Sequence, residues 1–384
     1  MKRRSVAVLD VRSSEVTILL GERGVNHTFV FKASKTEPYD GYEDGAFYDT
    51  ANLKEAILRA LSSVEQTCGE RVNRIYVGVP GEFTEVVPKE QDIGFPSARR
   101  IGPKELNMLF ESGREEREGA RFMRAASMIY VTADNRRVVN PAGLVTTGLS
   151  AALTYFYCKD YFAEVIGDIF AGCGVTDVRY IPAEYAEAIY LIPSETRDEY
   201  ALFLDAGNLS STVCVVLGNG ILAQRTFWAG KGQIAVRLMQ RFGLPYDAAL
   251  ALLSKANLFR RSESPDTEFN FRNHSYEIDS DALIEEIKCG LDDICEAVSA
   301  FLEECRGKEL DYKPLYVTGE GLCDIRGALE HVSKRLNRVS EQLAPNLPYY
   351  NKPAVSARIA LADMAYEDNR KSGFLYRLLN GFGG

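Results

Sequence analysis

The stretch "LFLDAGNLSSTVCVV" (residues 202–216) decides the fold of this chain. An apolar segment ends at Asp205, a turn of small and polar residues follows, and a second apolar segment begins at Val213. Apolar runs on both sides of such a turn predict two antiparallel strands joined as a hairpin. An earlier stretch, "VAVLDVRSSEVTILLGE" (residues 6–22), has the same layout, with Asp10 in the position of Asp205. The sequence therefore predicts two hairpins in which an aspartate ends the first strand.

Composition limits the class of protein. The chain has 384 residues, of which 46% are hydrophobic, and this is enough for two domains. A net charge of −9 disfavours a general nucleic-acid-binding protein, because phosphate contacts need clustered Lys and Arg. The 8 cysteines include no Cys-x-x-Cys pair and only 3 histidines occur, so we expect reduced core thiols and no metal cluster. No apolar run reaches the length of a membrane span, and Asp10 comes too early for a signal peptide, which predicts a cytoplasmic protein.

Strands and helices alternate in the same order in the two halves of the chain. Each hairpin is followed by segments with apolar residues at helical spacing. The predicted segments are a helix at 52–70, a polar stretch at 88–126 with a helical pattern at 103–117, a β-rich region at 127–158, helices at 232–243 and 245–258, a polar insertion at 260–281, and a long helix from about 281 to 305. A duplicated plan of this kind predicts two α/β lobes around a cleft.

Two such hairpins facing each other suit a nucleoside triphosphate. Tight turns of small residues offer backbone N–H groups to phosphates, and carboxylates hold Mg²⁺, usually through water. The stretch "VTGEG" (residues 317–321) is expected to open a helix after a strand, so that a nucleotide could lie against the backbone at its N-terminus. Each piece alone is weak evidence, because an aspartate after a strand is more often a turn-forming residue. The order of hairpin, hairpin and glycine turn is more specific.

This order resembles the actin-like ATPase superfamily, and within it the FtsA family of bacterial cell-division proteins. The resemblance covers nearly the whole chain. Its motifs are the first hairpin, "RIYVGVPG" before an inserted subdomain, "VVNPAGLVTTGLSAALTYFYC" at the end of that subdomain, "IPAEYAEAIYLIPSE" as the connecting helix, "WAGKGQIAVRLMQRFGLPYDAALALLSK" as two helices, and "NKPAVSARIALADMAYED" as the final helix of the core.

The resemblance implies an actin-like, ribonuclease H-like two-lobed α/β fold with an FtsA-type inserted subdomain. The expected division is a first-lobe core at 1–82 and 159–196, the inserted subdomain at 83–158, a second-lobe core at 197–228 and 314–366, its smaller subdomain at 229–313, and a C-terminal tail at 367–384.

The resemblance also implies ATP and Mg²⁺ as cofactors. Carried over position by position, the nucleotide-binding set is Asp10, Ser13, Ser14, Asp205, Gly207, Ser210, Ser211, Thr212, Gly230, Gly232, Lys255, Gly319 and Gly321. Within this set, Asp10 and Asp205 would hold Mg²⁺ through water.

Several residues depart from the family pattern at this site. The departures are Arg12 in place of a glycine, Glu15 in place of a lysine, Asn208 and Leu209 in place of glycines, Thr212 in place of an aspartate, Leu252 in place of a ribose-binding glutamate, and Glu320 within a glycine triplet. A reversal from Lys to Glu near a phosphate costs on the order of several kcal/mol at a partly buried site. We therefore expect weak ATP binding, turnover near background and no catalytic residues.

The end of the chain, "RKSGFLYRLLNGFGG", has the pattern of an interfacial helix. At helical periodicity the apolar residues fall in one arc, with Tyr376, Arg377 and Asn380 on the other side. Such a helix lays its apolar face into a membrane while its cations meet anionic headgroups. The expected membrane-binding residues are Lys371, Phe374, Leu375, Arg377, Leu378, Leu379 and Phe382. FtsA-like proteins carry a similar helix. The alternative is a last helix that docks on its own lobe.

The resemblance implies an adaptor. Such a protein polymerises with itself and tethers an FtsZ-type filament, through the smaller subdomain of the second lobe, to the inner face of the cytoplasmic membrane at the division site. One alternative is a PilM-like adaptor of pilus assembly, although PilM-like proteins lack the amphipathic tail. Another is a small-molecule kinase of the same superfamily, for which Glu85 or Asp92 could be proposed without a supporting motif.

Overall fold

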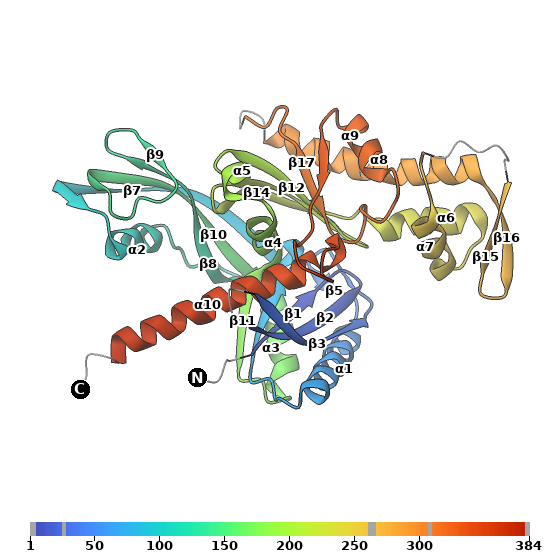
Figure 1. The fold of residues 1–384 in the computed structure, drawn as a ribbon, viewed down its shortest axis with the longest axis horizontal. Helices are drawn as coiled ribbons and strands as arrows, with labels where there is room; N and C mark the ends of the chain where they lie inside the picture. Colours follow the sequence, from blue (N-terminus) through green and yellow to red (C-terminus); the bar gives the residue numbers. More distant parts are fainter. Residues whose placement is uncertain (1–4, 25–27, 260–265, 306–308, 381–384) are drawn as a thin grey trace. The chain divides into compact units, whose positions relative to one another are not determined.

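A computed structural model describes residues 5–24, 28–259, 266–305 and 309–380, with the side chains of 266, 267 and 370–380 left aside (Figure 1). The described chain forms two compact units. Unit 1 falls within Met1–Leu191 and Ala357–Gly384, and unit 2 is Ile192–Ser356. The five-segment division expected from the resemblance stays a prediction.

Unit 1 contains a mixed five-stranded sheet in the order β11-β6-β1-β2-β3. The first hairpin is confirmed, because β1 and β2 pair antiparallel with Asp10 opposite Thr17. Strands β1, β6 and β11 run parallel, since β1 pairs with β6 and β6 with β11. The strands are β1 (Val6–Val11), β2 (Glu15–Arg23), β3 (Phe29–Pro38), β6 (Arg74–Val79) and β11 (Asp177–Pro182).

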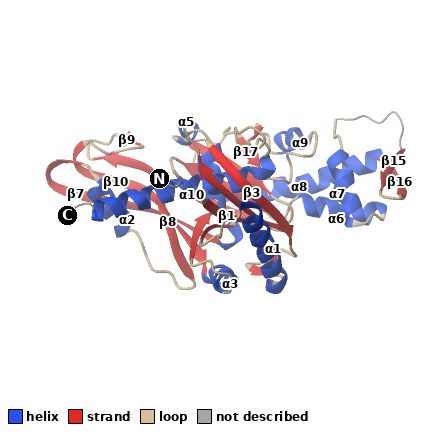
Figure 2. Ribbon diagram, turned by 60° about the horizontal axis from the view of Figure 1, so that its bottom comes forward, coloured by secondary structure: helices blue, strands red, loops and turns tan. Residues whose placement is uncertain are grey.

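Helix α1 (Thr50–Cys68) packs against β2 and β3 (Figure 2). The Asp49 carboxylate caps its start by accepting from the N–H groups of Ala51 and Asn52. Gly69 ends it in the left-handed conformation, at φ 64°. Its apolar face is buried in the core of unit 1, as the sequence spacing predicted. Two further helices of unit 1 are α3 (Asp160–Ala171) and α4 (Ala183–Leu191), and α4 directly follows strand β11.

A second sheet in unit 1, in the order β7-β10-β8-β9, carries helix α2 beside β7. Its elements are β7 (Thr84–Arg100), α2 (Pro103–Ser112), β8 (Ala120–Thr132), β9 (Arg137–Val138) and β10 (Val145–Lys159). The sequence analysis expected no strand in the polar stretch after residue 88, but β7 continues to Arg100. The helical pattern expected at 103–117 is confirmed by α2. Pro88 and Pro96 fit there because β7 is an edge strand, whose outer N–H groups need no partner.

Unit 2 is built on a five-stranded sheet in the order β14-β13-β12-β17-β18. The second hairpin is confirmed, with Asp205 on β12 opposite Thr212 on β13. The strands are β12 (Tyr200–Ala206), β13 (Ser211–Leu217), β14 (Gly220–Phe227), β17 (Leu315–Thr318) and β18 (Ser340–Gln342).

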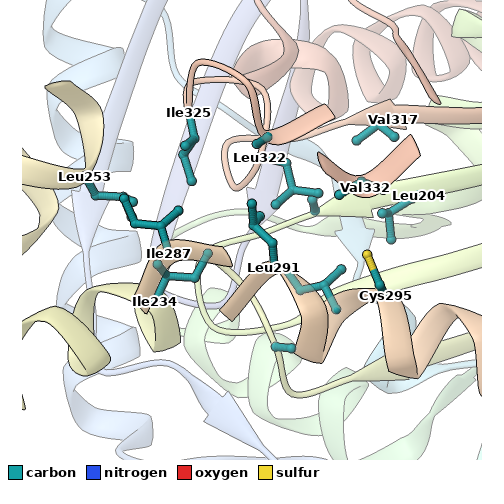
Figure 3. Close-up of a cluster of buried hydrophobic side chains, with 14 of the residues drawn as sticks. Leu204, Ile234, Leu253, Ile287, Leu291, Cys295, Val317, Leu322, Ile325 and Val332 are labelled. Carbon is teal, nitrogen blue, oxygen red and sulfur yellow. The ribbon is translucent and has the colours of Figure 1, made fainter. Parts of the chain in front are cut away.

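Helices α6 (Lys231–Phe242), α7 (Tyr246–Lys255), α8 (Ser280–Glu304) and α9 (Ala328–Arg335) share one hydrophobic core with this sheet. The short helix α5 (Ser194–Arg197) precedes β12. Figure 3 shows Leu204 and Val317 from the sheet gathered with Ile234, Leu291 and Val332 from the helices. The predicted helix at 281–305 is confirmed, because α8 spans Ser280–Glu304 and differs by one residue at each end.

The polar insertion at 260–281 contains a hairpin that the sequence analysis missed. Strand β15 (Asp266–Phe271) pairs antiparallel with β16 (His274–Asp279). Phe269 and Ile278 are buried against the core of unit 2. Alternation of apolar and polar residues across this stretch was the available signal.

The final helix, α10 (Ser356–Asn380), follows the short 3₁₀ turn Pro353–Val355 and belongs almost wholly to unit 1. Its early residues Ile359, Leu361 and Ala365 are fully buried. Within the described residues, no helix is both long enough and apolar enough to cross a membrane.

Candidate functional site

The first hairpin places Asp10 at the end of β1, where only 4% of the residue is exposed. The turn after it is held by backbone bonds. Arg12 N–H donates to the Glu15 carbonyl at 2.9 Å, and Tyr39 N–H donates to the Ser14 carbonyl at 3.1 Å. The Tyr39 hydroxyl donates to the Arg12 carbonyl at 2.6 Å. The loop that the resemblance assigns to phosphate binding is thus fixed by the chain itself.

Arg12 points its guanidinium at two buried carboxylates. Its Nε lies 3.4 Å from Asp10 Oδ1, and its Nη2 lies 3.1 Å from Glu187 Oε1. Glu187, on α4, has an exposed fraction of 0%. A side chain of the protein, Arg12, therefore supplies positive charge to these two carboxylates.

Two acidic residues of α4 were missed by the sequence analysis. Glu184 and Glu187 are buried, and Glu184 Oε1 accepts from the Gly81 N–H at 2.8 Å. The available signal was two glutamates three residues apart on an otherwise apolar helix. That spacing puts both on one face, where buried carboxylates need a function or a partner.

Glu15 begins β2 beside the same turn. Burial raises the pKa of the Glu15 carboxyl, the positive charge of Arg358 opposes the rise, and the charge of Asp10 adds to it. Arg358, in the first turn of α10, also donates to Thr17 Oγ1 at 3.2 Å. The carboxyl group predicted at this position is therefore present, but burial disfavours its ionised form.

This pKa shift predicts how Glu15→Gln changes stability with pH. A folded-state pKa above the usual 4.5 means that the proton stabilises the fold at low pH and that this contribution is lost as pH rises through the folded value. Glu15→Gln should therefore gain stability relative to the wild type between acidic and neutral pH. Urea unfolding across a pH series measures the difference. A difference that stays constant across the series would contradict the burial of this carboxyl.

In unit 2, the carbonyl groups of the second hairpin accept from neighbouring backbone. Ala206 O accepts from Gly321 N–H at 2.7 Å, Gly207 O from Lys231 N–H at 3.2 Å, and Asn208 O from Gly232 N–H at 2.7 Å. Lys231 and Gly232 are the first residues of α6. The N–H groups that a helix start could offer to an anion are therefore used by the hairpin turn.

Three of the predicted glycines are required by this packing. A Cβ added at Gly230 would lie 2.5 Å from the carbonyl oxygens of Gly207 and Asn208. A Cβ at Gly319 would lie 2.3 Å from Ala206 O, and one at Gly321 would lie 2.5 Å from Gly207 O. Protein backbone, rather than a ligand, explains the absence of a side chain at these positions.

The predicted hydroxyl groups are also engaged within unit 2. Ser211 Oγ donates to the Ala229 carbonyl at 2.6 Å and accepts from the Gly207 N–H at 3.3 Å. Thr212 Oγ1 lies 2.9 Å from Thr226 Oγ1. Two further hydroxyl-bearing residues of the predicted set, Ser13 in unit 1 and Ser210 in unit 2, are buried.

Lys255 lies apart from the hairpin residues. Its Nζ lies 5.2 Å from the ring centre of Phe269, and it lines a pocket of about 400 Å³ formed by α7, the β15–β16 hairpin and α8. Leu252, on the same helix, is part of the buried core of unit 2. It stands where the family pattern has a ribose-binding glutamate. The nucleotide-binding role of Lys255 stays a prediction.

The glycine turn after β17 does not open a helix. Gly319 has φ 91°, and α9 begins at Ala328. The expected helix N-terminus at residues 317–321 is wrong, because residues 319–327 form turns between the strand and the helix.

In the described structure, these residues do not fit Mg²⁺ and a triphosphate well. The guanidinium of Arg12 already neutralises Asp10, and the first N–H groups of α6 are capped. Among the described residues, no group of three or more His, Cys, Asp or Glu side chains is arranged to hold a metal ion. The binding roles assigned from the resemblance stay predictions.

Comparison with known proteins supports the fold. No family model matches the chain. The cell-division protein FtsA of Pseudomonas aeruginosa is 19% identical over 214 residues, which is 55% of this chain and 51% of that protein. The match thus spans about half the length of the FtsA relative.

Solved structures that match over nearly the whole chain include a chain of a pilus biogenesis complex and an MreB protein. A chain of the PilM–PilN type IV pilus biogenesis complex is 14% identical with a TM-score of 0.63, covering 95% of this chain and 99% of that one. MreB5 of Spiroplasma citri bound to ADP is 11% identical with a TM-score of 0.55, covering 96% and 98%. The expected actin-like, two-lobed α/β fold is confirmed.

Proposed function

We propose that this chain is an FtsA-type adaptor of cell division. It polymerises and links an FtsZ-type filament to the inner face of the cytoplasmic membrane at the division site, and the smaller subdomain at residues 229–313 binds the filament. ATP binding is weak and turnover is near background. The partial match to FtsA supports this role, and the confirmed fold is compatible with it.

The observation that carries the proposal is the anchoring of α10. Ion pairs fix the helix to unit 1, since Arg23 Nη1 lies 2.5 Å from Glu367 Oε1 and Arg124 Nη2 lies 2.5 Å from Asp368 Oδ2. Asn369 Oδ1 accepts from Arg74 and from the Tyr76 hydroxyl, each at 3.0 Å. The same helix continues without a break to Asn380 (Figure 1).

A continuous helix of this kind suits a tether. The predicted membrane-binding side chains, from Lys371 to Phe382, lie outside the described side chains, so their amphipathic arrangement stays a prediction from the sequence. The helical backbone runs without interruption from the anchored residues into this segment. A membrane-bound segment would therefore be joined to unit 1 by a helix and not by a flexible linker.

Turnover of ATP is expected to stay near background. Arg12 neutralises the aspartate that would act at the first hairpin, and the second hairpin is closed by its own backbone bonds. Phosphate release by the wild type should equal release by Asp205→Ala, and calorimetry should show weak Mg·ATP binding. Release well above that of Asp205→Ala would mean that the hairpins reopen and catalyse.

A second candidate is a PilM-type adaptor of pilus assembly. It is favoured by the structural match to a chain of the PilM–PilN complex, which covers nearly all of both chains, whereas the FtsA match covers about half. The cellular position of a fluorescent fusion discriminates the two. A ring at midcell is the result expected for the division role, and foci at the poles would overturn it in favour of the pilus role.

A further inference from the structure

The turn of the first hairpin holds an unusual concentration of charge. Asp10 and Glu187 have exposed fractions of 4% and 0%, and they come from strand β1 and helix α4. The guanidinium of Arg12, whose side chain is 18% exposed, lies beside both of their side chains. Burying two carboxylates without a nearby positive charge is strongly unfavourable.

We infer that Arg12 is a built-in cation that takes the part of a divalent metal ion at this turn. Its single positive charge lies beside both Asp10 and Glu187 and offsets part of their negative charge, so that unit 1 completes this site without metal and without nucleotide. Arg12 stands where the family pattern has a glycine. The arginine therefore adds an internal counter-ion and also fills the space that a glycine would leave. The inference concerns unit 1 alone and does not depend on the adaptor role.

The geometry around Arg12 favours arginine in particular. A planar guanidinium can present separate N–H groups to two carboxylates at once, which the single ammonium of lysine does less well. The backbone of Arg12 is held on both sides, because its N–H donates to the backbone carbonyl of Glu15 and its own carbonyl accepts from the Tyr39 hydroxyl. The side chain therefore starts from a fixed point beside the two carboxylates.

Removing this side chain should create a need for another cation. In Arg12→Ala, Asp10 and Glu187 would both lose the guanidinium that lies beside them. A hydrated Mg²⁺ carries the charge that is missing and prefers carboxylate oxygens. The variant should therefore be less stable than the wild type without metal and should recover stability with Mg²⁺, even though no nucleotide is added.

Thermal unfolding of the full-length chain, in EDTA and in millimolar MgCl₂, tests the inference. The wild type should unfold at the same temperature in both buffers. Arg12→Ala should lose on the order of 6–15 °C in EDTA, the loss expected for a broken buried ion pair in a unit of this size, and should regain part of it with MgCl₂. Arg136→Ala is the matched control, because Arg136 pairs with Asp134 at the surface, where both side chains are 59% exposed, and its loss should be small in both buffers.

Two further variants keep the test decisive. Adding Glu187→Gln to Arg12→Ala should restore part of the stability in EDTA and abolish the response to MgCl₂, because only the Asp10 carboxylate is then left without the guanidinium. Arg12→Lys should fall between the wild type and Arg12→Ala in EDTA, which remains measurable if Arg12→Ala fails to fold. The inference is overturned if MgCl₂ stabilises the wild type, if Arg12→Lys is as stable as the wild type, or if the metal response survives Glu187→Gln.

Discussion

Replacing Leu378 by glutamate is expected to abolish binding of the full-length chain to anionic liposomes. Each apolar side chain of the predicted arc contributes roughly 1.5–3 kcal/mol when it is fully buried in lipid, and each nearby cation about 1 kcal/mol. Ordering the segment offsets much of this gain, so a single tail binds reversibly and has little to spare. A charge within the arc should remove the binding that remains. Co-sedimentation with the liposomes measures it.

The matched control is Asn380→Glu, which makes the same change of charge on the side of the helix that periodicity turns away from the membrane. It should keep most of the binding. A chain ending at Asn369 keeps the contacts to Arg23, Arg74 and Arg124 and should not bind. If all four proteins pellet alike, the tail is not the anchor. If none pellets at high protein concentration, the helix docks on its own unit instead.

Gly319→Ala is expected to lower the free energy of unfolding of unit 2 by roughly 2–5 kcal/mol. The left-handed backbone at φ 91° costs a residue with a Cβ about 1–2 kcal/mol. Overpacking adds about 1–3 kcal/mol, because the new Cβ would lie 2.3 Å from Ala206 O in the central strand β12. Urea unfolding followed by fluorescence of Trp228, the single tryptophan of the chain, reports on this unit.

Gly243→Ala separates the two contributions. Gly243 ends α6 at φ 65°, and nothing lies within 4 Å of an added Cβ. Its replacement should therefore cost about 1–2 kcal/mol, the backbone contribution alone. Equal losses for Gly243→Ala and Gly319→Ala would contradict the close approach of the glycine turn to the second hairpin.

The local patterns of the sequence were sufficient for the hairpins and for most helices. Apolar runs around a small polar turn predicted the pairing of β1 with β2 and of β12 with β13, and helical spacing predicted α1 and α8. Strand β7 was missed because its prolines and charges are typical of a loop. An edge strand tolerates both, and only its position in the sheet reveals this.

The candidate site was harder to predict because its contacts are not local. The sequence identified Arg12 as a departure, but its partner Glu187 is 175 residues away, so the ion pair could not be read from either segment. Gly230, Gly319 and Gly321 were expected to belong to a nucleotide-binding site. The side-chain-free space they provide is filled by carbonyl groups of the second hairpin, and backbone contacts of this kind leave no other mark in the sequence.

Recruitment of a polymerised FtsZ-type protein to anionic liposomes tests the adaptor role most directly. The filament should co-sediment with the liposomes when the full-length chain is added, should stay in the supernatant when the chain is omitted, and should stay there when Leu378→Glu replaces the wild type. The contradicting result is a full-length chain that pellets with the liposomes while the FtsZ-type filament remains in the supernatant at every ratio of the two proteins.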